Sequence, residues 1–420
     1  MHLPPVIVSL RRHKAGVFLI GLQIALTLAI ACNLLSIVAH YAQHIDRPTG
    51  LDEANLFLIG QSFVNAPHGD TAVSLHKLDS MQLTDLAALR ALPDVANVAP
   101  VTTMPLMGST DMANVALKAG QLHGLTQAAL FLGDQNTVKT FGLHLIAGRD
   151  FTRAEVEPLS PGVAFAAPVV IVSKTLADKL YPHGNAVGQP LWLNNNTAPS
   201  TIVGVVARLI TSDPQGQAAY AYNTILIPAR NDAATTFYAV RARPGRMRHA
   251  MREARTALFR VDPLRIMRAQ GKYSSMGLHT FAQIRAQGYT LQIAMAQILS
   301  VVAVILLLVT GIGMTGLTSF WVRQRHKQIG IRRALGATRA NIRHYFQIEN
   351  LIIAGGGCAV GVVLAIGFNL ALMSMFQMHR MPVWYVAIGV AVILALGQLA
   401  VLIPARRAAN VPPVVATRSV

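Results

Sequence analysis

The segment Gln292–Leu317, QIAMAQILSVVAVILLLVTGIGMTGL, is followed three residues later by Trp321–Arg343, WVRQRHKQIGIRRALGATRANIR. The first stretch has no charged residue and is longer than the roughly 20 apolar residues that a transmembrane helix needs. The second carries seven Lys and Arg residues and no acidic one. Because short loops rich in Lys and Arg stay in the cytoplasm, this pair predicts a membrane helix that ends in a cytoplasmic loop.

Three more charge-free runs are long enough to cross a membrane: Ala15–Ile45, Asn350–His379 and Met381–Ala405. Only 13% of the chain is charged, against about 25% in an ordinary soluble domain. The sequence therefore predicts a membrane protein with four transmembrane α-helices and a large α+β extracytoplasmic domain inserted between helices 1 and 2. The two cysteines, Cys32 and Cys358, both fall in membrane spans, so they form neither a disulfide framework nor a metal site.

The distribution of charge sets the topology. Residues 46–285 hold 22 Lys/Arg and 17 Asp/Glu, whereas the rest of the chain holds 14 Lys/Arg and one acid, Glu349. Of those 14 basic residues, 13 lie on one side of the four spans. Both termini are therefore expected in the cytoplasm. The same distribution accounts for the net charge of +18, so no nucleic-acid partner is expected.

These arguments divide the chain into nine segments. The expected segments are a cytoplasmic N-terminal segment (1–15), transmembrane helix 1 (16–40), the external α+β core domain (41–285), transmembrane helix 2 (286–320), a cytoplasmic loop or helix (321–347), transmembrane helix 3 (348–376), a short external loop (377–382), transmembrane helix 4 (383–404) and a cytoplasmic tail (405–420). In the external domain, Val95–Val101 and Pro168–Val172 read as strands, and Ser173 is placed to cap a helix over Lys174–Leu180.

No catalytic constellation stands out in the sequence. The nearest approach to a phosphate-binding loop, Gly133–Thr140, has Val138 where a second glycine is required. We therefore expect no enzymatic activity and no cofactor bound by this chain, and no metal site. The uncharged polar residues of the spans, Gln23, Asn33, Asn369 and Gln398, are expected to bond between helices.

Small residues indicate close helix packing. Gly357 and Gly361 have the spacing that lets two membrane helices approach closely. The contact could lie within the chain or between two copies.

Several motifs, in order, resemble the MacB/FtsX-like family of ABC-transporter permeases. They are Phe141–Phe151, Val170–Leu180, Ala186–Pro190, Thr201–Val206, Gln328–Thr338 and Pro404–Ala409 with Pro413 and Arg418 beyond. The resemblance implies a MacB-like periplasmic core domain with an inserted subdomain at about 140–225, and an FtsX-like permease domain. The external side is then the periplasm, and the resemblance implies that 321–347 is a coupling element. It also implies a dimer of permeases in a bacterial inner membrane, coupled to separate ATPase subunits that carry the ATP and Mg²⁺.

The resemblance implies that ATP-driven motion of the second helices reshapes the periplasmic domain and drives export, a mode called mechanotransmission. The partners would be an ABC ATPase, a second permease copy or a paralogous permease, a lipid membrane, and in some systems a periplasmic adaptor and outer-membrane channel. An alternative is an FtsX-like scaffold that regulates a periplasmic partner such as a cell-wall hydrolase and transports nothing. The sequence does not identify the substrate.

The cytoplasmic loop suits docking on a partner. Ile329, Ile331, Ala334 and Leu335 form the apolar positions of a short helix that could seat in a groove; an interfacial helix on anionic lipid is the alternative. The predicted ATPase-coupling residues are Gln328, Ile329, Gly330, Ile331, Arg332, Arg333, Ala334, Leu335, Gly336 and Ala337. The predicted cytoplasmic C-terminal motif comprises Pro404, Arg406, Arg407 and Pro413.

Two positions depart from the family pattern. Gln328 stands where that family usually has Glu, and Pro413 is followed by Val414 and Val415 rather than by an acid. We therefore hypothesise that the chain is one half of a permease pair whose partner keeps the acidic positions. A functional complex that contains only this permease and an ATPase would contradict that hypothesis.

Overall fold

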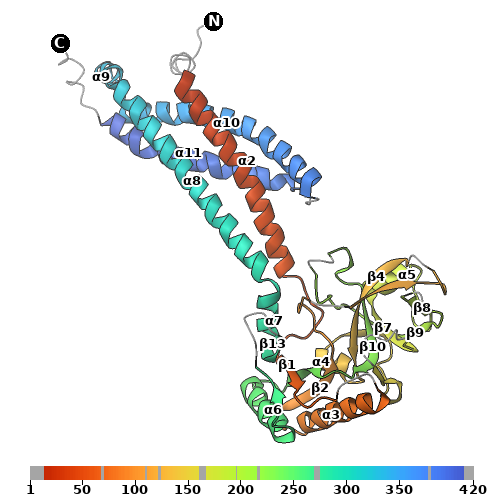
Figure 1. Cartoon of the computed structure of the whole chain (residues 1–420). Coiled ribbons are helices and arrows are strands. Elements are labelled where there is room, and N and C mark those ends of the chain that lie inside the picture. Colours follow the sequence, from red (N-terminus) through yellow and green to blue (C-terminus); the bar gives the residue numbers. More distant parts are fainter. Residues whose placement is uncertain are drawn as a thin grey trace. The chain divides into compact units, whose positions relative to one another are not determined.

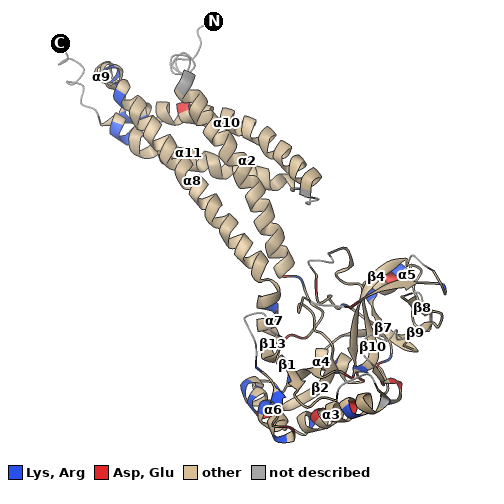
Figure 2. Cartoon of the chain, viewed as in Figure 1, with Lys and Arg blue, Asp and Glu red and all other residues tan. Residues whose placement is uncertain are grey.

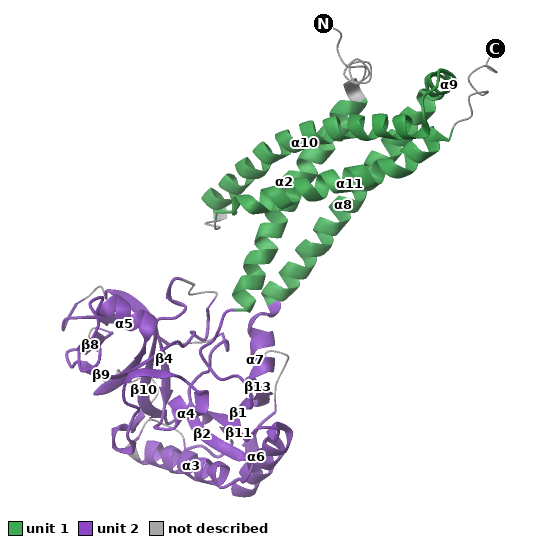
Figure 3. Ribbon diagram, turned by 180° about the vertical axis from the view of Figure 1, so that it is seen from behind, with its two compact units in different colours: residues 1–46, 291–420 green, residues 47–290 purple. Residues whose placement is uncertain are grey.

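A computed structural model describes residues 14–67, 71–108, 111–121, 124–159, 167–194, 196–214, 218–268, 275–376 and 380–410. The chain forms two compact units. One comprises residues 1–46 and 291–420, and the other comprises residues 47–290 (Figure 3).

The first unit is a bundle of long helices (Figure 1). They are α2 (Lys14–Ile45), α8 (Thr290–Gln324), α10 (Arg339–Phe376) and α11 (Val383–Ala409), with the short helix α9 (His326–Ala334) between α8 and α10. All four long helices are long and apolar enough to cross a membrane. Their shared core lies mainly between α2, α10 and α11, and is built from side chains such as Ile24, Leu28, Ile353 and Ile393.

The second unit contains two β-sheets. The first has the strand order β12-β1-β11-β2, with β13 also paired to β1. Its strands are β1 (Leu56–Phe63), β2 (Val95–Val101), β11 (Thr235–Ala242), β12 (Arg265–Ile266) and β13 (Gly277–Thr280). Two helices, α3 (Ala72–Arg90) and α6 (Met247–Val261), share a core with this sheet. A further helix, α7 (Phe281–Gly288), follows β13 directly.

The second sheet has the strand order β4-β3-β8-β9-β7-β10-β6, with β5 paired to β9. Its strands are β3 (Asp111–Ala116), β4 (Thr126–Gly133), β5 (Leu145–Gly148), β6 (Glu157–Leu159), β7 (Val169–Ser173), β8 (Pro190–Leu193), β9 (Ser200–Val206) and β10 (Thr224–Asn231). The helices α4 (Thr137–Phe141) and α5 (Lys174–Leu180) lie in the connections. The sheet is mixed, with parallel pairs such as β7 with β9 and antiparallel pairs such as β8 with β9.

The α+β architecture agrees with the prediction, and several elements match closely. The strand predicted at Val95–Val101 is β2. The helix predicted at Lys174–Leu180 is α5, and the Ser173 side chain accepts a hydrogen bond from the amide of Leu176. Four apolar helices flank a β-rich domain, as the charge and hydropathy pattern indicated.

The expected subdomain boundary needs correction. The insertion was expected at about 140–225, but β3 and β4 also belong to the second sheet, so that sheet begins at Asp111 and ends at Asn231. The segment 321–347, predicted to be a loop or helix, is mostly helical, because it contains the end of α8, all of α9 and the start of α10. The predicted tail also begins within a helix, since α11 continues through Pro404 to Ala409.

Candidate functional site

Capping interactions define the junction between α9 and α10. The helix α9 ends where Gly336 takes a positive φ of 99°, a conformation that costs glycine least. The amides of Gly336 and Ala337 then bond back to the carbonyls of Arg333 and Arg332. The side chain of Thr338 accepts a hydrogen bond from the amide of Asn341 and so starts α10. The sequence Gly-Ala-Thr thus forms a tight turn between two helices.

The two faces of α9 differ sharply. Ile329 is only 5% exposed, and it packs with Val322, Ile342, Phe346 and other residues of α8, α10 and α11. On the outer face, Ile331 is 47% exposed and Leu335 is 83% exposed. An apolar side chain as exposed as Leu335 contributes nothing to the core of its own bundle. It is available to a partner.

The structure therefore splits the predicted coupling residues into two groups. Ile329 and Gly330 are buried inside the bundle. The exposed group comprises Gln328, Ile331, Arg332, Ala334, Leu335 and Gly336, and two residues, Arg333 and Ala337, are half-buried. Sequence periodicity could not make this distinction, because it gives a helix an apolar stripe without showing which part of the stripe faces its own chain.

Three charged side chains attach α9 to its neighbours. The Nη1 atom of Arg325 lies 3.0 Å from each carboxylate oxygen of Glu349 on α10. The Nη1 atom of Arg333 donates to the carbonyl of Ala409 on α11 at 3.1 Å. The guanidinium of Arg332 lies over the ring of Tyr345, 4.9 Å from its centre. Figure 2 shows Lys and Arg gathered where α9 and the end of α11 lie.

The predicted C-terminal motif lies in the same part of the bundle. Pro404 is buried inside α11, while Arg406 and Arg407 are exposed in its last turns. Pro413 lies outside the described residues. The described part of this motif thus adds two exposed cations at the end of α11.

The glycine pair predicted to pack helices lies against α2. A Cβ atom at Gly357 would come within 2.9 Å of the carbonyl oxygen of Gly21. One at Gly361 would come within 3.0 Å of the backbone of Ala25. Within the described structure, this contact joins α10 to α2 of the same chain.

The uncharged polar residues of the spans bond between segments, as predicted. Gln23 donates to the carbonyl of Val309, and Asn33 donates to that of Ala365. The amide of Met381 donates to the side chain of Asn369, and Gln398 donates to the carbonyl of Gln347. Each bond joins two helices or a helix to the segment before the next. These residues tie the bundle together.

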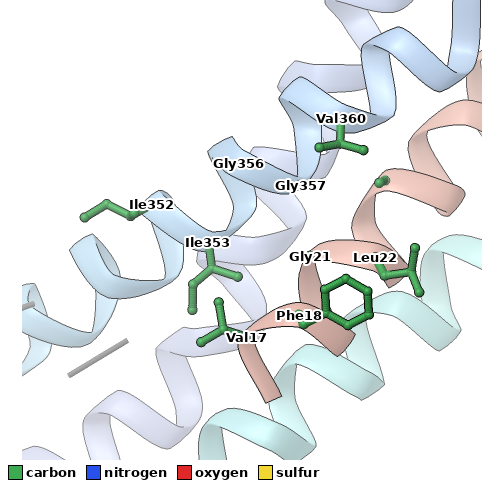
Figure 4. Close-up of a pocket in the computed structure, with 10 residues that line it drawn as sticks. Val17, Phe18, Gly21, Leu22, Ile352, Ile353, Gly356, Gly357 and Val360 are labelled. Carbon is green, nitrogen blue, oxygen red and sulfur yellow. The ribbon is translucent and has the colours of Figure 1, made fainter. Parts of the chain in front are cut away.

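An apolar groove of about 290 Å³ lies between α2 and α10 (Figure 4). Its lining includes Val17, Phe18, Leu22, Ile352, Gly356 and Val360, and none of the lining residues is charged. The groove therefore offers no ionic recognition of a ligand.

One cluster in the second unit was not foreseen from the sequence. His249 and Glu253 lie one turn apart on α6, and the Nδ1 atom of His249 is 2.5 Å from an oxygen of Asp94. These three residues have ligand atoms within 4.8 Å of one another. However, Arg246 lies 3.9 Å from Asp94, and α6 also carries exposed arginines (Figure 2). This positive surrounding disfavours a cation, so we interpret the cluster as an ion-pair group.

The fold and this site define a class of protein: a membrane protein with four candidate spans, a large domain inserted after the first, and a short, partly exposed helix between the second and third. Residues 19–258 match the family described as MacB-like periplasmic core domain. Residues 300–413 match the FtsX-like permease C-terminal family. The chain belongs to the MacB/FtsX-like family of ABC-transporter permeases.

Named relatives are exporters. The chain is 28% identical over 346 residues to the pyoverdine export ATP-binding/permease protein PvdT of Pseudomonas putida, covering 80% of this chain and 48% of that protein. It is 27% identical over 341 residues to the macrolide export ATP-binding/permease protein MacB 1 of Yersinia pestis bv. Antiqua, covering 79% of this chain and 48% of the relative. The chain spans about half the length of the curated relatives it matches.

A solved structure is also similar. The crystal structure of the periplasmic region of MacB from Actinobacillus actinomycetemcomitans aligns with 58% of this chain and 96% of its own length, at 13% identity and a TM-score of 0.33.

Proposed function

We propose that this chain is the membrane subunit of an ABC exporter of the mechanotransmission type, in a bacterial inner membrane with the 47–290 unit in the periplasm. An ATPase subunit docks on α9 from the cytoplasm, and its nucleotide cycle moves the helix bundle. That motion reshapes the periplasmic unit and drives export of a substrate. The permease acts as a dimer, with a second copy or with a paralogous permease. The relatives named for export of pyoverdine and of macrolides support the export role.

The observation that carries the proposal is the double character of α9. Its inner face is locked into the bundle by Ile329, while its outer face presents Ile331 and Leu335 beside exposed cations. A short helix with apolar anchors on its free side fits a hydrophobic groove in a partner. The exposed Arg332 is placed to form ion pairs with acidic groups at the rim of that groove.

The sequence contains no phosphate-binding-loop motif, which supports the proposal that a partner hydrolyses ATP. In the structure, the nearest approximation, Gly133–Thr140, leads from the end of β4 into α4. A Cβ atom at Gly133 would lie 2.1 Å from the Oγ1 atom of Thr137. Gly133 is therefore packed closely against the side chain of Thr137.

The docking role is tested by introducing charge on the outer face. We expect the double variant Ile331→Asp, Leu335→Asp to reduce copurification of the ATPase at least about tenfold, because each anchor would carry an unpaired carboxylate into an apolar groove. The double variant Ala340→Asp, His344→Asp is the matched control, since these exposed residues in the first turns of α10 add the same number of carboxylates at the same spacing of four residues. Unchanged assembly and ATP-driven export in the double variant would refute the docking role.

A deletion of the gene separates export from a purely regulatory scaffold. The proposal predicts that cells without the chain accumulate the exported molecule and keep normal division. A chaining or division defect with unchanged export would favour the scaffold.

A further inference from the structure

A buried ion pair lies at the start of α9. The side chains of Arg325 and Glu349 are 10% and 2% exposed. Arg325 is the residue just before α9, and Glu349 lies near the third turn of α10. Both carboxylate oxygens accept from one guanidinium nitrogen at 3.0 Å. This pair therefore joins the start of α9 to α10, in addition to the packing of Ile329 and the contact of Arg332 with Tyr345.

The pair is distinctive in composition as well as in burial. Glu349 is the only acidic residue in 286–420, a stretch that holds eleven basic ones. In the loop, Arg323, Lys327, Arg332, Arg339 and Arg343 are all exposed. Arg333 is half-buried, and Arg325 is the only one of the seven cations in the loop that is buried. Arg325 is bonded to this one acid.

Stability alone does not explain such a pair. The cost of removing two charges from water offsets most of their attraction, and apolar residues of similar volume often serve as well. A guanidinium–carboxylate contact instead restricts the relative orientation of the two side chains, because both groups are planar and few orientations allow them to bond. We therefore interpret the pair as a device that fixes the orientation of α9.

Other contacts complete the attachment. At its beginning, α9 is joined to α8 through the amide of Arg325, which bonds to the carbonyls of Trp321 and Val322. Ile329 fills the core between the helices, and Arg333 bonds to the end of α11. The short helix is thus held by α8, α10 and α11 together.

We propose that Arg325 and Glu349 are positioning residues that fix α9 on α10, so that, together with the bond from Arg333 to Ala409 of α11, α9 and the adjoining ends of α10 and α11 form one rigid lever. A displacement of α9 imposed by a bound ATPase then reaches α10 and α11 as well as α8. This inference rests on the proposed docking of an ATPase at α9. It assigns the ion pair to transmission of motion and not to binding of the ATPase.

The test measures motion at the far end of α11. Val383 begins α11 and is 76% exposed, so Val383→Cys accepts a spin label in the full-length permease, assembled with its ATPase in lipid nanodiscs. The native cysteines are buried. The readouts are ATPase copurification and the change of the label's spectrum on adding ATP and vanadate.

We expect Arg325→Glu and Glu349→Arg each to keep ATPase copurification and to reduce the ATP-dependent spectral change by about tenfold, within the range of ordinary coupling free energies. The double exchange Arg325→Glu, Glu349→Arg restores the pair with its direction reversed, and it should recover at least about half of the change. Arg323→Glu reverses an exposed neighbour and should behave as wild type.

Two results would overturn the inference: single variants that bind the ATPase and retain the spectral change, or a double exchange that does not recover the ATP-dependent spectral change. If the single variants fail to accumulate, the double exchange decides, and its own failure to accumulate also counts against the inference. A wild-type permease that binds no ATPase would instead refute the proposed docking. A wild-type complex that binds the ATPase without any change at residue 383 would refute the lever alone.

Discussion

Asp232 shows how a single buried carboxyl group can make the periplasmic-type unit sensitive to pH. It follows β10, is 4% exposed, and its Oδ1 atom has no hydrogen-bond partner among the described residues. Burial, and then the nearby charge of Asp79, raise the pKa of Asp232 from 3.8 to about 6, although Arg230 opposes the shift. The folded state therefore favours the protonated form. The stabilising contribution of the protonated Asp232 carboxyl group is complete below about pH 4 and is lost as the pH rises through about 6.

The variant Asp232→Asn should remove this dependence. At pH 7.5 we expect the free energy of unfolding of the second unit to rise by up to about 3 kcal/mol. At pH 4 we expect it to change little, since the wild-type carboxyl group is then protonated. Hydrogen exchange of the β10 amides in the full chain measures the difference. Asp178→Asn is the control, because that side chain is 63% exposed. An equal gain at both pH values would show that the charge of Asp232 is not the cause.

At the scale of helices, α2 and α10 approach closely because one glycine of the run 355–357, Gly357, lies on the face of α10 that contacts α2. Gly357 faces the backbone of α2, whereas Gly355 has no atom of another segment within 4 Å of a Cβ position. The two positions are two residues apart on one helix and have the same intrinsic propensity. Their difference therefore isolates the effect of packing.

We predict that Gly357→Leu lowers the thermal midpoint of the detergent-solubilised protein and reduces its yield. A leucine there must push the helices apart, at a cost of about 1–3 kcal/mol or more. Gly355→Leu should be tolerated and keep a wild-type midpoint. Similar losses in both variants would indicate that glycine is needed for a reason other than the contact with α2.

The elements predicted well are those whose signals are local. The cap at Ser173 and the strand Val95–Val101 follow from adjacent residues. The second sheet was placed too late along the chain because β3 and β4 pair with partners such as β8 and β10, whose positions no local pattern reveals. The buried pair of Arg265 and Asp85, 180 residues apart, was hidden for the same reason.

The candidate site was predicted in part. Sequence pattern gave a short basic helix with apolar positions at Ile329, Ile331 and Leu335. It could not show that Ile329 belongs to the bundle, because Ile342 and Val401 reach it from other helices. Nor could it pair Arg325 with Glu349 among seven loop cations.

At the scale of the whole molecule, the topology has a direct test. Thr338→Cys and Glu157→Cys place single exposed thiols in the loop and in the second unit. If positive charge sets orientation, a membrane-impermeant maleimide should label residue 157 in intact cells and residue 338 only after the inner membrane is permeabilised. Labelling of residue 338 in intact cells would reverse the topology and remove α9 from the cytoplasm.

The central claim is that an ATPase sits on the outer face of α9, and site-specific photo-cross-linking in living cells tests it most directly. A photo-reactive amino acid replaces Leu335, which is 83% exposed, and in a parallel strain it replaces Val383, which is 76% exposed at the opposite end of the bundle. We predict a cross-link from position 335 to an ABC ATPase and none from position 383. No cross-link at 335, or equal cross-linking at both positions, would contradict the claim.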